Sequence, residues 1–392
     1  MGGNHGVQIK TGIFFKNARR SGIWPDARTV DDSTVSKARL KVRWQIFVEL
    51  LHKFVQLAYS LWPRSAAYYW KNMSVFAIDG SRYTLPATDQ LRQEFDPDSG
   101  LDHYSKGHFP IALVSTVYDV FKRLPVARLV SPAKASERND AKKLVSLLPQ
   151  GNVILFDRGY PGYEFFLNML QYQGYFIARC PAKSTFPAIM KFVRSSGNDA
   201  IITIKPTHDY LVKTKDKTAT ELRLRVIKLI RPDGSIWVYV TNLMDTRLFR
   251  KEEIAELYSR RWAIEVHYRD EKVSLEIESF HSKNSNGIRQ ELYAAAIMTV
   301  ITRLMMVLPS SPEEPASVNP QFKYAIITMA SEASVLVPDA PAMAIRLFQE
   351  ILLELAKIKY HKPRNKRPSY PRITKRPMNK WQFHRRCSVA YA

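Results

Sequence analysis

The segment from Tyr258 to Lys272 places a carboxylate among several cationic side chains. Four of its residues follow one another at steps of three, four and seven: Tyr258, Arg261, Glu265 and Lys272. On a continuous α-helix, which turns about 100° per residue, these steps put all four side chains on one narrow face. That arrangement suits a site where the acid holds a divalent metal and its neighbours hold phosphate oxygens. An exposed helix with ordinary salt bridges is the alternative.

Two aspartates elsewhere in the chain could complete such a site. The apolar runs "MSVFAIDGSRYTL" and "NVILFDRGY" read as strands that end at Asp79 and at Asp157. The ends of two such strands can be neighbours in one sheet although they are far apart in sequence. Either aspartate alone is better explained as a turn carboxylate. Together with Glu265, they offer three hard oxygen ligands for one or two Mg²⁺ ions, which drive in-line displacement at phosphorus.

The surrounding pattern predicts a mixed α/β fold. A hairpin followed by βαβ units is expected from Met73, then a strand-rich stretch that looks like an inserted β-subdomain, then one long helix from about Phe249 to Lys272. The first thirty residues look loosely ordered. We divide the chain into a mostly helical, DNA-binding N-terminal region (1–72), the first part of the catalytic domain (73–183), a β-rich insertion (184–245), the second part of the catalytic domain (246–308), a C-terminal helical region (309–356) and a basic tail (357–392).

The charge of the chain indicates a polyanionic partner. Of its 392 residues, 59 are Lys or Arg and 36 are Asp or Glu, and nucleic acid is the commonest partner of so basic a protein. The tail from Lys357 to Arg386 contains no acid and predicts a clamp on the DNA backbone, with a disordered cationic tail as the alternative. The N-terminal region adds basic residues that could meet phosphates or line a solvated helix face: Lys37, Arg39, Lys41 and Arg43.

Cysteine usage and hydropathy favour a soluble protein of a reducing compartment. Cys180 and Cys387 are too few for a disulfide framework and too far apart for a zinc motif. No charged and apolar N-terminal signal is present, and Arg303 interrupts the most apolar run, Leu292 to Leu308. We therefore expect a cytoplasmic, nucleoid-associated protein without a membrane partner.

The order of "FAIDGS", "VILFDRGY" and the Tyr258-x2-Arg261-x3-Glu265-x6-Lys272 spacing resembles the DDE transposases of the insertion-sequence-four family. That family is defined by its Tyr-Arg-Glu-Lys signature, and the resemblance covers roughly Met73 to Leu304. It implies a prokaryotic transposase with a ribonuclease-H-like mixed sheet flanked by helices. It also implies that Asp79, Asp157 and Glu265 are catalytic and bind two Mg²⁺ ions, for which Mn²⁺ can substitute. The signature residues Tyr258, Arg261 and Lys272 would then bind DNA.

The resemblance also implies a reaction. Relatives with a β-insertion cut the second DNA strand through a hairpin and use an insertion tryptophan to receive a flipped base. Trp237, in "SIWVYV", stands at the expected place, although a core aromatic in an alternating strand is an equal alternative. The implied function is cut-and-paste transposition, with inverted-repeat ends and target DNA as partners and a homodimer in the synaptic complex.

Two other functions agree with the same residues. A structure-selective nuclease on this fold would hydrolyse DNA without joining strands. An inactive or truncated transposase would bind DNA with an affinity that falls steeply with salt, and would form no Mg²⁺-dependent product. The N-terminal region lacks a clear helix-turn-helix, which keeps this last alternative open.

Overall fold

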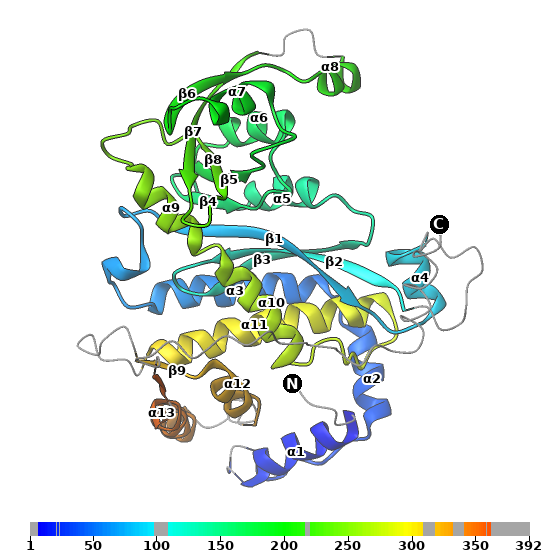
Figure 1. The fold of residues 1–392 in the computed structure, drawn as a ribbon. Helices are drawn as coiled ribbons and strands as arrows, with labels where there is room; N and C mark the ends of the chain where they lie inside the picture. The colour runs from blue at the N-terminus through cyan, green and yellow to red at the C-terminus, as the bar shows by residue number, and fades with distance from the viewer. Residues whose placement is uncertain are drawn as a thin grey trace.

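The computed structural model describes residues 7–20, 22, 24–97, 109–215, 220–308, 318–331, 341–357 and 359–361. At its centre lies an eight-stranded sheet with the order β3-β2-β1-β4-β5-β8-β7-β6 (Figure 1). Its strands are β1 (Val75–Thr84), β2 (Ile111–Asp119), β3 (Leu124–Pro132), β4 (Val153–Phe156), β5 (Tyr175–Cys180), β6 (Asp199–Ile204), β7 (Leu222–Ile230) and β8 (Ile236–Thr241). A separate antiparallel pair joins β9 (Val318–Pro320) to β10 (Lys359–His361).

The first five strands have the arrangement of a ribonuclease-H-like fold. β1, β2 and β3 form an antiparallel meander, and β4 and β5 run parallel to β1 on its other side. All four residues of β4 are buried, which explains why its sequence is a continuous apolar run. The predicted fold class, a mixed sheet flanked by helices, is therefore confirmed.

The strands expected in the insertion extend this sheet instead of forming one of their own. β8 pairs antiparallel with β5, and β7 and β6 follow it outward. Arg225 of β7 is fully buried, forms an ion pair with Asp199 and donates to the carbonyls of Leu243 and Phe249. The insertion is thus hydrogen-bonded both to β5 and to the segment that leads back to Glu265.

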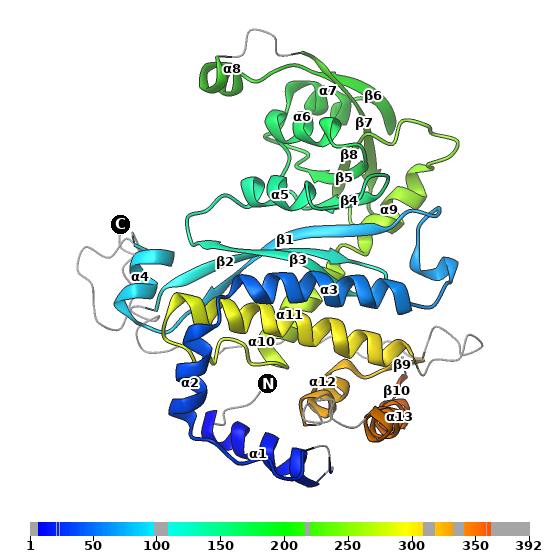
Figure 2. The ribbon, with the colours of Figure 1, turned by 180° about the vertical axis from the view of Figure 1, so that it is seen from behind.

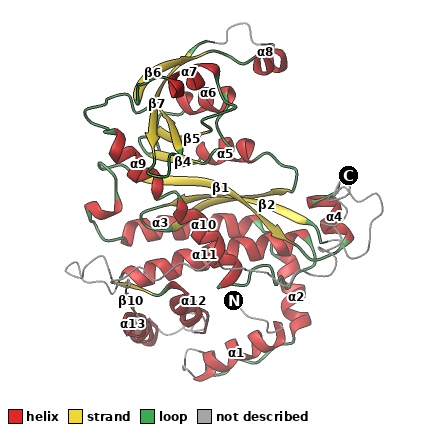
Figure 3. Cartoon of the chain, viewed as in Figure 1, coloured by secondary structure: helices red, strands yellow, loops and turns green. Residues whose placement is uncertain are grey.

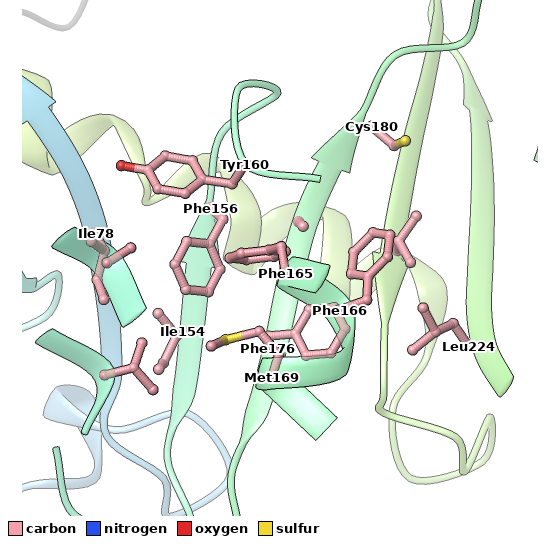
Figure 4. Packing of buried hydrophobic residues seen from close by; sticks show 14 of the residues in the cluster. Ile78, Ile154, Phe156, Tyr160, Phe165, Phe166, Met169, Phe176, Cys180 and Leu224 are labelled. Carbon is pink, nitrogen blue, oxygen red and sulfur yellow. The ribbon is translucent and has the colours of Figure 1, made fainter. Parts of the chain in front are cut away.

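Helices cover both faces of the sheet (Figures 2 and 3). On one face, α5, α6 and α7 pack on a core that includes Ile154, Phe156, Phe166 and Phe176 (Figure 4). On the other face, α4, α9, α10 and α11 contribute to a second core, and α3 packs against α11 and β3. The helices are α1 (Val7–Arg20), α2 (Asp32–Lys41), α3 (Gln45–Leu61), η1 (Ala66–Tyr68), α4 (Asp89–Phe95), α5 (Glu137–Val145), α6 (Tyr163–Gln171), α7 (Pro187–Arg194), α8 (His208–Thr214), α9 (Lys251–Ser259), α10 (Trp262–Val273), α11 (Ser285–Val307), α12 (Phe322–Ser331) and α13 (Pro341–Lys357).

Two expected elements that carry site residues differ from the structure. The strand of Asp79 does not end there, because β1 continues to Thr84 and pairs with β2 along that length. The single long helix predicted around Glu265 is two helices, α9 and α10, separated at Arg260 and Arg261. The backbone N–H groups of these two residues donate to carbonyls three positions earlier, which tightens the chain and redirects it.

The N-terminal region also differs from expectation. Residues 7–20 form the helix α1, although the first thirty residues were expected to be loosely ordered. Arg39, a candidate phosphate ligand, forms an ion pair with Glu291 of α11 at 2.9 Å, whereas Lys37, Lys41 and Arg43 are exposed. The basic tail, apart from Lys357 and β10, lies outside the described residues, as does Cys387; Cys180 is a buried free thiol.

One helix of the described residues is long and apolar enough to cross a bilayer. This helix is α11, but 72% of its most apolar window is buried inside the protein. Such burial is typical of the central helix of a folded core, and α11 does pack between α3 and α12.

Candidate active site

The sheet brings Asp79 and Asp157 side by side. β1 and β4 are parallel, with Ala77 opposite Leu155, and each aspartate lies two residues further along its own strand direction. Asp157 directly follows β4, as predicted, whereas Asp79 lies within β1 beyond the last residue that pairs with β4. Both side chains are half-buried. β4 ends at Phe156 and its pairing with β1 ends at Ala77, so the sheet is open where the two acids meet.

Arg261 connects this pair to Glu265. Its guanidinium lies 3.5 Å from Asp79 and also donates a short hydrogen bond to Glu265, four residues further along the chain. Glu265 is in the first turn of α10, on the side that faces β1. Arg261 thus contacts two of the three predicted acids, and the charge of the third, Asp157, also acts on its guanidinium.

α10 is held against β1 by a tyrosine. The hydroxyl of Tyr268 lies 2.7 Å from the main-chain carbonyl of Asp79 and 3.1 Å from that of Val114. Because Tyr268 is three residues after Glu265, it contacts the same strand on the same side of the helix. The relative position of Glu265 and Asp79 is therefore fixed by a direct contact between their elements.

Tyr258 belongs to the site but is not a freely exposed phosphate ligand. It is 5% exposed, and its hydroxyl donates to the carbonyl of Phe156, the residue before Asp157. Burial, opposed by Arg261, raises the pKa of Tyr258 above its usual range. The Arg261 guanidinium lies 6.0 Å from the Tyr258 ring centroid. In this structure, Tyr258 therefore supports the acid-bearing end of β4.

The acids of the site outnumber the cations that neutralise them. The pKa of Asp79 is raised to about 6, chiefly by burial; Arg261 and the Gly80 N–H oppose this shift, and the charges of Glu137 and Asp157 contribute to it. Glu137 is a fourth carboxylate that sequence analysis did not identify. A Cβ atom on Gly80 would lie 2.9 Å from the carboxyl carbon of Glu137, so glycine is what allows this close approach.

The donor set suits a hard divalent cation. As the side chains stand, no three Asp, Glu, His or Cys groups of the described residues are close enough to hold a metal ion. Arg261 instead supplies the positive charge between Asp79 and Glu265. Burial first, and neighbouring carboxylates second, raise the pKa of Asp79, and a divalent cation, which prefers carboxylate ligands, would stabilise its charged form. The residues thus fit such a metal, provided that the Arg261 side chain moves aside.

Lys272 and Trp237 lie further from the acids. The Lys272 ammonium donates to the Arg82 carbonyl on β1. Trp237 is half-buried, with the guanidinium carbons of Arg179 and Arg231 at 4.2 and 4.4 Å from its ring centroid. The strand register relates this cluster to Asp157. Phe156 of β4 pairs with Ala178 of β5, so the next residues, Asp157 and Arg179, lie side by side. Arg179 in turn pairs with Tyr239 of β8, two residues from Trp237.

Sequence reasoning missed Glu137, Arg179 and Arg231. Glu137 is the first residue of α5, whose N-cap is Ser136, and the Ser136 hydroxyl accepts from the N–H of Asn139. Nothing in the spacing shows that this helix begins beside β1. Arg179 has a signal in its strand. Because β4 and β5 are parallel and Phe156 pairs with Ala178, Arg179 must lie beside Asp157.

The chain is similar to known transposases. The model of the family described as "Transposase DDE domain" matches residues 70–301. The protein y4zB of Sinorhizobium fredii, named as a transposase, is 24% identical over 201 residues, which is 51% of this chain and 55% of that protein. The transposase InsG of insertion sequence element IS4, from Escherichia coli, is 22% identical over 283 residues, or 71% of this chain and 62% of InsG.

A solved structure of the piggyBac transposase synaptic complex with hairpin DNA aligns with 71% of this chain and 57% of that one, with 9% identity and a TM-score of 0.40. The chain spans less than two thirds of the length of the two curated relatives. The family match covers more than half of the chain and contains the two aspartates and the whole Tyr-Arg-Glu-Lys signature. The chain therefore belongs to the DDE-domain transposases.

Proposed function

We propose that the protein is a cut-and-paste DNA transposase of an insertion sequence, with Asp79, Asp157 and Glu265 as its metal-binding catalytic acids. The observation that carries this proposal is that Arg261 contacts both Asp79 of β1 and Glu265 in the first turn of α10, while the parallel pairing of β1 and β4 places Asp157 beside Asp79. A structural ion pair would need one acid for one arginine. Here the acids are in excess, and a site of this kind takes up positive charge.

The residues have distinct roles in the proposed reaction. Two Mg²⁺ ions, or Mn²⁺ in their place, would activate water or a 3′-hydroxyl and stabilise the leaving oxygen. Asp79, Asp157 and Glu265 would hold these ions. Arg261, released from Asp79 and Glu265, has a planar guanidinium that can bind a DNA phosphate through two hydrogen bonds. Lys272 binds a second phosphate as a flexible point charge, and Tyr258 keeps the Asp157 end of β4 in place.

The cluster around Trp237 supports a hairpin intermediate. Two guanidinium groups lie on its ring, so that a phosphate beside a displaced base would draw them away and leave the ring free to stack. We expect Trp237→Ala to slow hairpin formation about tenfold, because one base stack contributes ~1–3 kcal/mol. The first nick should keep its rate, and Trp237→Phe should be close to wild type. An equal loss in both steps would contradict a role in receiving the base.

DNA is the proposed partner, as transposon ends and as target, and the active species is a homodimer that holds two ends. The formal charge of +23 supports binding to a polyanion. We place the protein in the cytoplasm, associated with the nucleoid. Sedimentation of the protein with DNA ends should give a complex of two chains and two ends. A complex of one chain with one end, unchanged at higher protein concentration, would contradict the dimer.

The central experiment is a cleavage assay with labelled DNA that carries the ends of the element. Nicked, hairpin and joined products should appear with Mg²⁺ in the wild type and should be lost in Asp79→Asn, Asp157→Asn and Glu265→Gln. Each loss should be at least about 1000-fold, equivalent to ~4 kcal/mol of transition-state stabilisation. Glu256→Gln, which removes an exposed carboxylate from the neighbouring helix α9, is the matched control and should remain active.

The alternatives predict different products in the same assay. A structure-selective nuclease would give hydrolysed strands and no joined product. An inactive transposase would bind the DNA, would give no Mg²⁺-dependent product and would not respond to Glu265→Gln. Either result would overturn the proposed function.

A further inference from the structure

The side chain of Tyr160 ends in a buried hydroxyl group without a hydrogen-bond partner. The residue is 1% exposed, and within the described residues no acceptor or donor lies within hydrogen-bond distance of its hydroxyl. An unpaired buried donor destabilises a folded protein, because the group loses its bonds to water and gains none in return. A phenylalanine would fill the same space without this penalty. Packing therefore does not explain the hydroxyl.

The turn after β4 orients this tyrosine. The backbone N–H of Tyr160 donates to the carbonyl of Asp157 at 3.2 Å. Its ring packs against Phe156 and Phe165, with centroid distances of 5.3 and 6.0 Å. Figure 4 shows that the hydroxyl end of the ring points away from these phenylalanines, toward the strand β1 that carries Ile78. The next residue of that strand is Asp79.

The charges of the active-site carboxylates act on this hydroxyl. Burial raises the pKa of Tyr160 well above its usual value, and the negative charges of Asp79, Glu137 and Asp157 contribute to this. The group is therefore a firmly protonated donor beside an excess of acids. None of these carboxylates accepts its hydrogen bond in this structure.

We propose that Tyr160 is a further binding residue of the active site, whose hydroxyl donates a hydrogen bond to an oxygen atom of the ligand that enters the acid cluster. This inference rests on the proposed function. The acceptor is either a water of the hydration shell that Mg²⁺ and Mn²⁺ retain, or a phosphate oxygen of DNA. The motif Asp157-Arg158-Gly159-Tyr160 would thus supply both an acid and a donor to one site.

Tyr160→Phe tests the proposal, with Tyr293→Phe as the matched control. Tyr293 is also buried, at 2% exposed, but its hydroxyl donates to the carbonyl of Arg128 at 2.9 Å. Without ligand, we expect the melting temperature of Tyr160→Phe to equal or exceed that of the wild type. Tyr293→Phe should melt roughly 2–4 °C lower, because it loses a formed hydrogen bond. An equal decrease in both variants would overturn the proposal, since the Tyr160 hydroxyl would then have a partner in the free protein.

Two binding measurements identify the source of the oxygen. Mn²⁺ affinity is measured without DNA by electron paramagnetic resonance, and affinity for a terminal-repeat duplex is measured in EDTA by fluorescence anisotropy. We expect Tyr160→Phe to weaken one of the two by about tenfold, as loss of a supporting group at a metal site does. The Mn²⁺ result would identify hydration water and the DNA result a phosphate. If neither affinity changes, the proposal is wrong.

These measurements stand apart from the test of the proposed function. Neither affinity depends on strand cleavage, whereas the proposed function is judged by cleavage in the wild type and its loss in Glu265→Gln. Tyr293→Phe should bind Mn²⁺ and DNA as the wild type does.

Discussion

The helix α10 takes part in two arginine and carboxylate clusters that differ in how their charges are balanced. On its buried side, Glu271 forms an ion pair with Arg128 at 2.7 Å and accepts from the hydroxyl of Tyr83. The side chains of this pair are at most 1% exposed. On the side of the active site, Arg261 contacts both Asp79 and Glu265, whose side chains are 19% and 32% exposed.

The pKa values of the two clusters shift in opposite directions. Burial acts to raise the pKa of Glu271, yet Arg128, His267 and the hydrogen bonds to Tyr83 and Arg128 hold it below the usual value. Asp79 is less buried, but its pKa is raised to about 6. One cluster is neutral and complete within the protein, and the other leaves negative charge for a ligand to neutralise. Arginine and carboxylate contacts on one helix can thus be structural on one side and functional on the other.

The largest expected effect separates the two clusters by stability. Glu271→Ala leaves the Arg128 guanidinium buried without a carboxylate and should lower the free energy of unfolding by about 3–5 kcal/mol. Glu265→Ala removes a partly exposed acid from a site with excess acids and should change the free energy of unfolding by less than about 1 kcal/mol. Urea denaturation at pH 7.5 measures both. Equal destabilisation would show that the clusters do not differ as described.

An apolar replacement of the whole pair serves as the control for Glu271. The double variant Arg128→Met with Glu271→Leu leaves no buried charge and should be much less destabilised than Glu271→Ala. If the double variant is the less stable of the two, the unpaired guanidinium is not the cause of the loss.

A smaller effect should appear in the pH dependence of stability. The pKa of Asp79 is about 6 in the folded protein and 3.8 in its unperturbed state, so the folded state binds more protons between these values. This contribution to stability is complete below about pH 4 and is lost as pH rises through about 6. In EDTA, Asp79→Asn should therefore be more stable than the wild type at pH 7.5, by ~1–3 kcal/mol, and similar to it at pH 4. Parallel pH profiles of the two proteins would contradict the raised pKa.

The smallest effect concerns the fourth carboxylate. Glu137→Gln removes a negative charge beside Asp79 and should lower the pKa of that aspartate by a fraction of a unit. When Asp79→Asn is introduced into the Glu137→Gln protein, its gain in stability should therefore begin at a lower pH than it does in the wild-type background. The same measurement in the Glu256→Gln background is the control and should show no movement. A shift in both backgrounds would point to net charge instead of the contact across Gly80.

The strands of the mixed sheet were predictable because local sequence patterns indicate them. Buried parallel strands are short apolar runs, and Asp157 follows such a run directly. The break at Arg260 and Arg261 was not predictable, since no glycine or proline marks it and the signature spacing continues across it. The end of β1 was misplaced for a related reason. Asp79-Gly80 resembles a turn, but that glycine serves the close approach of Glu137.

Charge balance in the site could not be read from the sequence. Tyr268, Glu137 and Tyr160 come from three separate elements, and only the packed sheet brings them near Asp79. The Tyr268 hydroxyl, three residues after Glu265, lies outside the signature and shows no pattern of its own. Local periodicity thus predicts which residues share an element, whereas long-range contacts decide which elements meet.

The pairing of β8 with β5 fixes the distance between Asp157 and Trp237. The strand of Trp237 lies two strand spacings from that of Asp157, about 10 Å, and Trp237 is two residues beyond Tyr239 along it, about 7 Å. Because β4, β5 and β8 belong to one hydrogen-bonded sheet, no hinge can change the distance between Asp157 and Trp237. The sheet therefore holds the backbone of Asp157 and that of Trp237 about 12 Å apart, and in the proposed reaction the DNA would have to match this fixed distance. A change in strand register between β5 and β8 would change this distance, and with it, in the proposed reaction, the nucleotide that the Trp237 ring could receive.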